Sequence, residues 1–426
     1  MCRQDCLHHA LAMISEEEAR KKILETVRPL PSRRLPPSQA LGCFAAEDYF
    51  ARLPLPMFDN SAMDGYAVVA SSSTKGARLR VTGEQPAGRD RRLRISPGEA
   101  VRIFTGAPVP QTADAIVMQE DVTRERDEIL INTDIKAGDF IRRRGCDLAE
   151  GQRILTKGER LGGATTALLA SQGIADVMVG GEAKAAIVST GDELVKPGAK
   201  LEPGQIYESN SVLLGALLER CGAVVNLAEH CRDERESLIE TIKRGIKNHI
   251  LIISGGVSVG EHDLVKDALH ELGAQIDIWR VAIKPGKPFL FGQVPNKSFY
   301  PAGETPAGPT GKMPVLRSCF VFGLPGNPVS AFVTFLQFVR PAILKMAGAT
   351  DFTLPQVPAK LAVDLRNDGD RAHYVRGKLE HGRFTPVGRQ ESHALFGLSQ
   401  SNALLRLAVG QSLKADEIVE VQIWDR

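Results

Sequence analysis

The chain lacks the cysteine patterns that bind metals or build disulfide frameworks. It has seven cysteines, an odd number at scattered positions, and no two of them form a CxxC pair. Neither a zinc ribbon nor a set of disulfides is therefore expected. Cysteines without such a pattern are typical of a reducing compartment, so the sequence predicts a cytoplasmic protein.

Aromatic residues and net charge are also scarce. Aromatic side chains make up 5% of the chain, and 53 basic residues nearly balance 51 acidic ones, which leaves a formal charge of +2. Neither nucleic acid nor an anionic membrane is therefore an expected partner. No apolar run reaches about 18 residues, so no membrane span is predicted. Residues 1–12 lack the apolar core of a signal peptide and are interpreted as a ragged tail or an upstream translation start.

What is present is the composition of a globular protein with several domains. The chain has 426 residues, of which 43% are hydrophobic, and at about 150 residues per domain this length predicts roughly three domains. Residues 15–27 form an amphipathic helical pattern, and the run Leu53-Pro54-Leu55-Pro56 indicates a domain boundary. Short apolar runs with glycine turns between residues 58 and 147 predict a small β domain.

From residue 183 the pattern changes to alternating strands and helices. Apolar runs end in polar, glycine-rich segments, and amphipathic helices follow them. This order predicts a parallel sheet covered by helices on both faces. Residues 295–318 have no periodicity and are interpreted as a surface loop, and short strands from residue 354 onward predict a last β domain.

Three polar segments follow strands of the predicted sheet. They begin at Ser189, Ser254 and Gly323. Ligands bind beyond the carboxyl ends of parallel strands, and glycines let the backbone approach them closely. Acidic residues in and near these segments suggest a divalent cation beside phosphate groups. Ordinary turns remain an alternative for each segment, and Asp233 and Asp263 are also possible helix caps.

Two further motifs each allow more than one interpretation. Residues 284–288 (KPGKP) place two lysines on a stiff turn that suits an oxyanion, although a solvated turn has the same pattern. Residues 256–260 (GVSVG) match G-x-S-x-G. In a nucleophile elbow the serine stands directly at the strand end, whereas here three residues intervene, so a serine hydrolase is disfavoured. His262 has no second histidine at metal-ligand spacing.

Taken together, the motifs resemble one known family. The segments that carry the resemblance are 58–68 (FDNSAMDGYAV), 105–107 (TGA), 113–117 (ADAIV), 189–194 (STGDEL), 254–261 (SGGVSVGE), 284–288 (KPGKP) and 323–330 (GLPGNPVS). In this order they resemble the molybdopterin molybdenumtransferases, which complete molybdenum cofactor synthesis. The resemblance runs from about Met13 to the C-terminus.

The resemblance implies a multidomain α/β architecture and an elongated homodimer. A helical linker domain would comprise residues 13–56 and 149–182, with a β domain inserted at 57–148. An α/β domain at 183–350 would have the molybdopterin adenylyltransferase fold, and a small β-barrel-like domain would occupy 351–426. Family members bind adenylylated molybdopterin and molybdate, hydrolyse the adenylate and release AMP. Further implied partners are molybdopterin adenylyltransferase and molybdoenzyme apoproteins or chaperones.

The resemblance also implies roles for individual residues. The glycine loops would hold pterin and phosphates through Thr190, Gly191, Gly255, Gly256, Ser258, Gly260, Gly326 and Asn327. Mg²⁺ would be held by Asp192, Glu193, Asp233 and Asp263. Molybdate would be held by Lys284, Lys287, Ser330 and Arg371. The second subunit would complete the cleft with Asp64, Thr105, Arg142 and Asp147. The expected catalytic residues are Asp64, Thr105, Glu193 and Asp263. The metal oxyanion itself enters the reaction, so no side-chain nucleophile is required.

Some residues depart from the family pattern, and alternatives remain open. Thr112, Cys146 and Leu264 stand where the family more often has Gly, Glu and Tyr, and residues 295–318 lengthen a stretch that is usually short. A tungstate-specific paralogue and a molybdopterin adenylyltransferase are close alternatives. A binding scaffold, as in the C-terminal domain of gephyrin, is an alternative of another class.

Overall fold

The computed structural model describes residues 13–256, 264–295 and 318–424. The chain divides into two compact units. Unit 1 contains the residues up to Glu47, Lys157–Gly162 and the residues from Asp176 onward, and unit 2 contains Asp48–Thr156 and Gly163–Ala175. The four domain boundaries predicted from the sequence are finer than this division and stay predictions.

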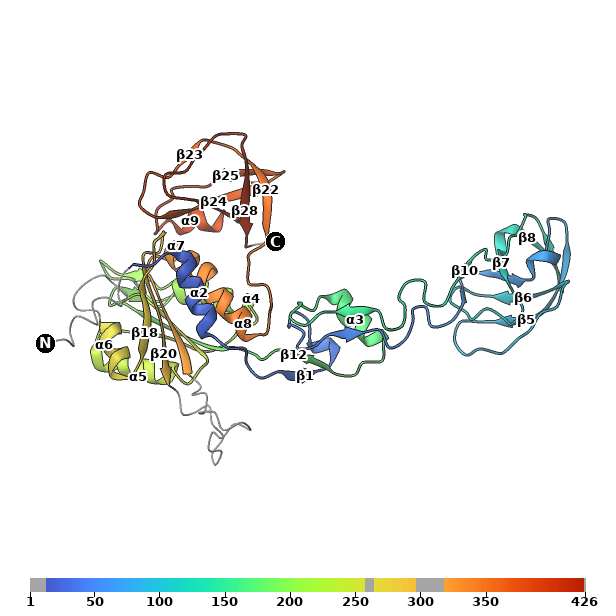
Figure 1. Ribbon diagram of the computed structural model, residues 1–426, viewed down its shortest axis with the longest axis horizontal. Helices are drawn as coiled ribbons and strands as arrows, with labels where there is room; N and C mark the ends of the chain where they lie inside the picture. The colour runs from blue at the N-terminus through green and yellow to red at the C-terminus, as the bar shows by residue number, and fades with distance from the viewer. Residues whose placement is uncertain (1–12, 257–263, 296–317, 425–426) are drawn as a thin grey trace, which may run out of the picture. The chain divides into compact units, whose positions relative to one another are not determined.

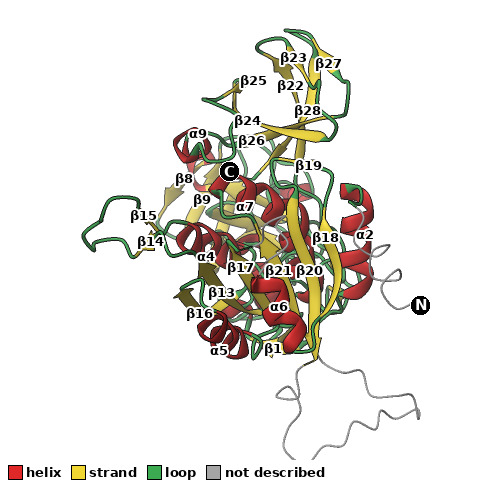
Figure 2. Cartoon of the chain, turned by 90° about the vertical axis from the view of Figure 1, so that its left-hand side faces the viewer, coloured by secondary structure: helices red, strands yellow, loops and turns green. Residues whose placement is uncertain are grey.

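A mixed six-stranded sheet forms the centre of unit 1 (Figure 2). In order across the sheet, its strands are β16 (Val224–Cys231), β13 (Lys184–Thr190), β17 (Ile250–Ser254), β21 (Ser318–Leu324), β20 (Pro288–Pro295) and β18 (Gln275–Arg280). The first four strands are parallel to one another, as predicted. Strand β20 is antiparallel to both β21 and β18, so the expectation of a purely parallel sheet was wrong on this side.

The reason for this difference lies at the ends of β20. The strand begins and ends with a proline. Pro288 belongs to the segment interpreted as a turn, and Pro295 belongs to the segment interpreted as a loop, so the apolar residues between them were not predicted to form a strand. Pro295 pairs with Ser318 at the end of the ladder between β20 and β21. The predicted loop at 295–318 therefore joins two neighbouring strands, and its residues 296–317 lie outside the described part of the chain.

Helices cover both faces of this sheet, as the sequence predicts. On β17, Ile250 and Ile252 contribute to one apolar cluster, and Leu251 and Ile253 contribute to the other. Side chains alternate between the faces of a strand, so a strand that is apolar throughout needs helices on both sides. The first cluster includes α2 (Glu16–Thr26), α4 (Asn210–Arg220), α7 (Pro328–Thr334) and α8 (Arg340–Met346). The second includes α5 (Arg235–Gly245) and α6 (Leu264–Glu271).

Helix α2 shows how the sequence starts a helix here. Ser15 accepts a hydrogen bond from the Glu18 backbone N–H, and the Glu18 side chain accepts one from the Ser15 N–H. This reciprocal capping box satisfies two backbone donors at the helix start. Ala19 and Ile23 are fully buried, and α2 packs beside α8 (Figure 1).

The helical run Pro328–Met346 passes through the core of unit 1. A π-helical segment, Phe335–Val339, connects α7 to α8. The run is apolar and, at 19 residues, long enough to cross a membrane by length and composition. In the structure 89% of it is buried inside the protein. It therefore serves as a core helix of the sheet.

A small β barrel follows at the C-terminal end of unit 1. Its strands are ordered β19 (Ile283–Lys284), β24 (Ala372–Glu380), β25 (Arg383–Pro386), β22 (Gln356–Leu361), β28 (Ile418–Ile423) and β26 (Ala403–Leu407). Strand β26 also pairs with β24, which closes the ring. The smaller elements of unit 1 are α9 (Leu395–Ser399) and the strand pairs β1 (Arg33–Leu35) with β12 (Val177–Val179), β14 (Leu194–Val195) with β15 (Ile206–Tyr207), and β23 (Leu365–Arg366) with β27 (Ser412–Leu413).

Unit 2 is built mainly from strands, as predicted for residues 58–147. Its six-stranded sheet has the order β7 (Ala115–Met118), β4 (Gly65–Val68), β6 (Glu99–Ile103), β5 (Arg78–Gln85), β9 (Glu128–Ile131) and β8 (Val122–Glu125). Unit 2 also contains α3 (Gly163–Ser171) and the strand pairs β2 (Tyr49–Phe50) with β11 (Arg153–Leu155) and β3 (Asn60–Ser61) with β10 (Ile141–Arg142).

Candidate functional site

A polar cavity of about 610 Å³ lies at the carboxyl ends of β13, β17 and β21. We call it the candidate cavity. The three strands are parallel neighbours, so the segments that follow them meet at one edge of the sheet. The residues predicted from the sequence that line it are Thr190, Gly191, Glu193, Asp233, Gly255, Gly256, Gly326 and Asn327. The structure thus brings the three glycine-rich segments together.

Two of these glycines are required by close contacts with Thr190. A Cβ atom on Gly255 would lie 2.5 Å from the Thr190 carbonyl oxygen, and one on Gly256 would lie 2.7 Å from Thr190 Oγ1. Both glycines also have positive φ angles, of 89° and 63°, which residues with a side chain rarely adopt. The loop after β17 can therefore approach the end of β13 only because these positions lack side chains.

Two buried polar atoms at this edge have no hydrogen-bond partner among the described residues. They are Thr190 Oγ1 and Asn210 Oδ1, and both residues line the candidate cavity. Thr190 is 4% exposed and Asn210 is 8% exposed. The Asn210 amide nitrogen donates to Ser254 Oγ at 2.8 Å and to the Gly326 carbonyl at 2.7 Å. Because unpaired buried polar atoms are costly, these two oxygens are suited to a ligand that donates hydrogen bonds.

Glu208 holds the start of α4 against the end of β13. Its buried carboxylate accepts a hydrogen bond from Ser189 Oγ at 3.0 Å and from the Ser211 backbone N–H at 2.7 Å. The Ser211 hydroxyl donates to the other carboxylate oxygen. Glu208 thereby fixes the first turn of α4, from which Asn210 projects to the cavity.

Carboxylates gather along one side of the cavity. The Asp233 backbone N–H donates to Asp192 Oδ1 at 3.2 Å. Burial raises the pKa of Asp233, and repulsion from Asp192 and Glu193 raises it further. His230, which contacts the Gly191 carbonyl at 2.9 Å, opposes this shift. A cation beside the three carboxylates would relieve their repulsion.

The described residues do not form a complete metal site on their own. Within residues 13–256, 264–295 and 318–424, no group of three or more His, Cys, Asp or Glu side chains is arranged to hold a metal ion. Mg²⁺ commonly uses one or two carboxylates and takes its other ligands from water and substrate phosphates. The carboxylate side of the cavity is compatible with that kind of binding.

Basic side chains form a second cluster, where the α/β sheet joins the β barrel. Strand β19 pairs in parallel with β24, which places Lys284 opposite His373 and beside the segment that carries Arg371. Arg371 Nε donates to Asp370 Oδ1 at 2.9 Å, and Lys287 helps to lower the pKa of Asp370. This arrangement gathers residues that lie far apart in the sequence.

The turn of Lys287 also packs against α7, which carries Ser330. A Cβ atom on Gly286 would lie 2.5 Å from Thr334 Cγ2 and 3.7 Å from the Ser330 carbonyl oxygen. Pro288, the next residue after Lys287, lines the candidate cavity. The predicted oxyanion residues Lys284, Lys287, Ser330 and Arg371 therefore lie in one region next to the cavity.

His373 shows that this region is electropositive. Burial and, to a lesser extent, the charges of Lys284 and Arg376 together lower its pKa to about 4. Its Nε2 atom is buried, and no hydrogen-bond partner for it lies in the part of the chain that the structure describes. The imidazole is therefore neutral at pH 7 beside fixed positive charges, which favours the binding of an anion.

The predicted second-subunit residues belong to unit 2. Asp64 Oδ1 accepts hydrogen bonds from the Thr105 backbone N–H at 2.7 Å and from Thr105 Oγ1 at 2.8 Å, and these bonds lower the pKa of Asp64. Arg142 lies on β10, opposite Asn60 of β3. The Asp147 backbone N–H donates to the Leu55 carbonyl at 3.0 Å. The pair of Asp64 and Thr105 is thus a direct contact, which spacing alone did not establish.

Sequence reasoning did not reach every residue of the site. Cavity-lining residues that it did not indicate are Ile206, Tyr207, Glu208, Ser209, Asn210, His393 and Leu395. Most of these residues do not follow a glycine-rich strand end, so no local sequence pattern indicated that they line a ligand site. The predicted residues Ser258, Gly260 and Asp263, as well as His262, lie outside the described residues.

Family models match three parts of the chain. Residues 14–173 match the MoeA N-terminal region (domain I and II), and residues 358–424 match the MoeA C-terminal region (domain IV). Residues 186–345 match a probable molybdopterin binding domain. This middle match contains the strand ends that line the candidate cavity, and the C-terminal match contains Arg371 and His373.

Curated relatives extend the match over nearly the whole chain. A protein of Haemophilus influenzae is 36% identical over 421 residues, which cover 96% of this chain and 98% of the relative. It is named molybdopterin molybdenumtransferase. The chain belongs to the MoeA family. A second family member, molybdopterin molybdenumtransferase 2 of Mycobacterium tuberculosis, is 35% identical over 433 residues and covers 97% of this chain and 100% of its own.

Solved MoeA structures have the same fold. A molybdopterin biosynthesis MoeA protein from Pyrococcus horikoshii matches with a TM-score of 0.76 and 31% identity, covering 97% of this chain and 100% of the archaeal one. A molybdopterin biosynthesis MoeA structure from Pyrococcus horikoshii OT3 matches with a TM-score of 0.77 and 28% identity. The multidomain α/β architecture predicted from the sequence is therefore confirmed.

Proposed function

We propose that this MoeA family member inserts molybdate into adenylylated molybdopterin and releases AMP in an Mg²⁺-dependent step. Membership of the family makes the chain a transferase. The observation that carries the proposal is the adjacency of three features in unit 1. These are a row of carboxylates, a basic cluster, and a polar cavity whose buried oxygens lack a hydrogen-bond partner among the described residues.

The candidate cavity suits the organic part of the substrate. Thr190 Oγ1 and Asn210 Oδ1 can each accept a hydrogen bond from an amino or ring N–H group of a pterin, and neither has another partner among the described residues. The glycine loops expose backbone next to these atoms, where phosphate groups can approach closely. The predicted role of Gly191, Gly255 and Gly326 in phosphate binding is retained in this proposal.

Mg²⁺ is proposed to bind on the carboxylate side. Asp192, Glu193 and Asp233 would hold it, and it would neutralise the charge that develops as the pyrophosphate bond breaks. The raised pKa of Asp233 supports this assignment, because a cation lowers the cost of keeping all three carboxylates ionised. Asp263 remains a predicted fourth ligand.

Molybdate is proposed to bind at the basic cluster. Lys284, Lys287 and Arg371 supply charge-assisted hydrogen bonds to its oxygens, and Ser330 adds a hydroxyl. His373 stays neutral there and limits the total positive charge. Because the oxyanion enters next to the cavity, the chain needs only to position the two substrates against each other.

The proposal includes a homodimer in which unit 2 of one copy completes the cleft of the other. Hydrogen bonds from Thr105 keep the exposed Asp64 carboxylate ionised, so it can accept a hydrogen bond or bind a cation at the surface of the unit. Arg142 and Asp147 would contribute to the same face. We also propose a cytoplasmic location, where the reduced dithiolene of the substrate is stable.

The deciding experiment measures AMP release from adenylylated molybdopterin with Mg²⁺. Parallel reactions contain molybdate, tungstate or no oxyanion. Release that depends on molybdate supports the proposal. Release that depends on tungstate alone would assign the chain as the tungstate-specific paralogue. Absence of release from folded protein would favour a scaffold or the preceding adenylylation step.

A matched pair of variants tests the Mg²⁺ assignment. Asp233→Asn should raise the Mg²⁺ concentration needed for half-maximal AMP release by about ten-fold, since one carboxylate is lost. Asp267→Asn, on the exposed side of α6, should leave that concentration unchanged. An unaltered requirement in Asp233→Asn would remove this residue from the proposed ligand set.

A further inference from the structure

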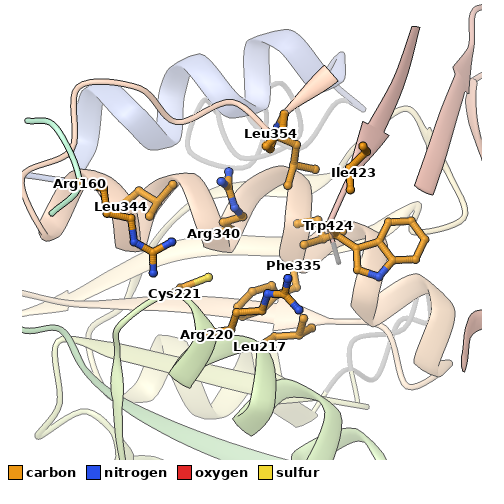
Figure 3. A pocket seen from close by; sticks show the side chains of 12 residues that line it. Arg160, Leu217, Arg220, Cys221, Phe335, Arg340, Leu344, Leu354, Ile423 and Trp424 are labelled. Carbon is orange, nitrogen blue, oxygen red and sulfur yellow. The ribbon is translucent and has the colours of Figure 1, made fainter. Parts of the chain in front are cut away.

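A second cavity in unit 1 is lined by three arginines. Its volume is about 180 Å³, and it opens to solvent between α4, α8 and the end of β28 (Figure 3). We call it the arginine cavity. The arginines are Arg160, Arg220 and Arg340, and the apolar lining includes Phe335 and Trp424. It is separate from the candidate cavity, with which it shares no lining residue.

Helix α4 separates the two cavities along its axis. Asn210, its first residue, lines the candidate cavity, and Arg220, its last residue, lines the arginine cavity. At a rise of 1.5 Å per residue, these positions lie about 15 Å apart along the helix. A ligand in the arginine cavity therefore occupies a site of its own.

In the described part of the chain, two of the arginines donate hydrogen bonds to backbone carbonyls rather than to carboxylates. Arg160 donates to the Gly42 carbonyl at 3.1 Å, and Arg340 donates to the Phe352 carbonyl at 2.8 Å. Neither guanidinium forms a salt bridge with a described carboxylate. Burial and the charge of Arg160 lower the pKa of Arg340, although Asp351 opposes this effect. Arg340 is half-buried, and a charge in such a place is stabilised by an anion, whereas Arg160 is exposed and can reach the same anion from the rim of the cavity.

The cysteine in this cavity does not supply the missing negative charge. Burial raises the pKa of Cys221 to about 11, even though Arg340, Arg160 and Arg220 all act to lower it. The thiol is therefore neutral at pH 7. Its position among the guanidinium groups nevertheless shows that the three arginines converge on one region (Figure 3).

The rest of the lining fits a small ring. Phe335, Leu217 and Leu354 line the cavity, and the indole of Trp424 lies at the end away from Arg160 (Figure 3). An apolar cavity of about 150 Å³ is large enough for benzene, so 180 Å³ admits one ring with a charged substituent. The cavity thus combines an apolar wall with a group of guanidinium donors that suits an oxyanion.

We propose that the arginine cavity binds a small organic oxyanion, a carboxylate or phosphate carried on a single ring. The oxyanion lies against Arg160 and Arg340, and the ring lies against Leu354 and Trp424. The two possible head groups have the same recognition chemistry, in which planar guanidinium groups donate to oxyanion oxygens.

Tryptophan fluorescence of the full-length protein tests this proposal. The chain has two tryptophans, and a Trp279→Phe background leaves Trp424 as the only one. Benzoate, phenyl phosphate, inorganic phosphate and the neutral benzyl alcohol are titrated separately. We expect saturable changes with benzoate or phenyl phosphate, and at least about ten-fold weaker binding of inorganic phosphate and benzyl alcohol. Tighter binding of benzoate would identify a carboxylate head group, and tighter binding of phenyl phosphate would identify a phosphate.

Arginine variants make the test specific. Arg160→Gln and Arg340→Gln should each weaken binding of the preferred ring anion by about ten-fold or more. Arg235→Gln, an exposed arginine on α5 that does not line this cavity, should bind as the parent does. Arg160 is exposed, so its variant gives a readout even where Arg340→Gln fails to fold. The proposal is overturned if neither ring anion binds at millimolar concentration, or if Arg160→Gln binds as the parent does.

Discussion

Gly255 offers the sharpest test of how the candidate cavity is built. An alanine at this position would place its Cβ atom 2.5 Å from the carbonyl oxygen of Thr190, which is backbone and cannot rotate away. The same substitution at Gly273 meets nothing within 4 Å. Both glycines have positive φ angles, of 89° at Gly255 and 77° at Gly273. The pair therefore separates backbone strain from steric contact.

The expected magnitudes follow from these two contributions. A side chain at positive φ costs about 1–2 kcal/mol, which is the whole effect expected of Gly273→Ala. Gly255→Ala adds an overpacked contact, worth about 1–3 kcal/mol, so its total cost is about 2–5 kcal/mol. Each kcal/mol lowers the Tm of a unit of this size by about 2–4 °C. Differential scanning calorimetry should thus show Gly255→Ala melting several degrees below Gly273→Ala.

Ligand binding supplies a second readout for the same pair. The carbonyl of Thr190 has to move to admit the new methyl group. The Thr190 hydroxyl, which lines the cavity and has no hydrogen-bond partner within the described ranges, would move with it. We expect Gly255→Ala to bind AMP more weakly by isothermal titration calorimetry, with Gly273→Ala unchanged. The reasoning is refuted if the two variants have equal stability, or if Gly255→Ala binds AMP as the parent protein does.

Three other substitutions have defined outcomes. Arg406→Met leaves the buried Glu16 carboxylate without its partner, and the 37% exposure of the Arg406 side chain reduces the expected cost to about 2–3 kcal/mol. Burial raises the pKa of Glu16 above its ordinary value of 4.5. Urea unfolding should therefore show this cost at pH 7, where the carboxylate is ionised, and should show no cost below about pH 4.5, where Glu16 is protonated in both the folded and the unfolded protein. Lys284→Gln should raise the pKa of His373 from about 4 in an NMR titration, although burial keeps it below 6.5; an unchanged value would contradict their proximity. Asp64→Asn should slow AMP release by about 100-fold with an unchanged Tm, and retained activity would exclude Asp64 from catalysis.

Much of the fold could be predicted because its signals are local. The capping box at Ser15 and Glu18, the apolar run of β17 and the polar strand ends each depend on a few neighbouring residues. These patterns determine the type of each element and the edge of the sheet at which ligands bind. The antiparallel strand β20 was missed because its flanking prolines resemble turn signals, and pairing with β21 depends on contacts across the sheet.

The site was predictable to a similar extent and for the same reason. The glycine-rich segments at the strand ends indicated Thr190, Gly255 and Gly326, and the structure places these residues around one cavity. Asn210 had no such signal, since its importance depends on Ser254 and Gly326, which are distant in the sequence. The convergence of Arg160, Arg220 and Arg340 is of the same kind, because it arises only when three separate segments pack together.

The basic cluster shows most clearly how a long-range contact creates a site. Lys284 and His373 are neighbours only because the chain leaves the α/β sheet after β18, and β19 then pairs with the first residues of β24 in the barrel. That register sets the distance between the lysine turn and Arg371, so it also sets the space available to an oxyanion. A change that weakens the β19–β24 pairing should consequently weaken molybdate binding without altering any proposed ligand. Ile283 provides this test, because its buried side chain holds β19 in place and its backbone pairs with Ala372. Ile283→Ala should therefore lower molybdate affinity more than AMP affinity, and equal losses would show that the two regions depend on a common support.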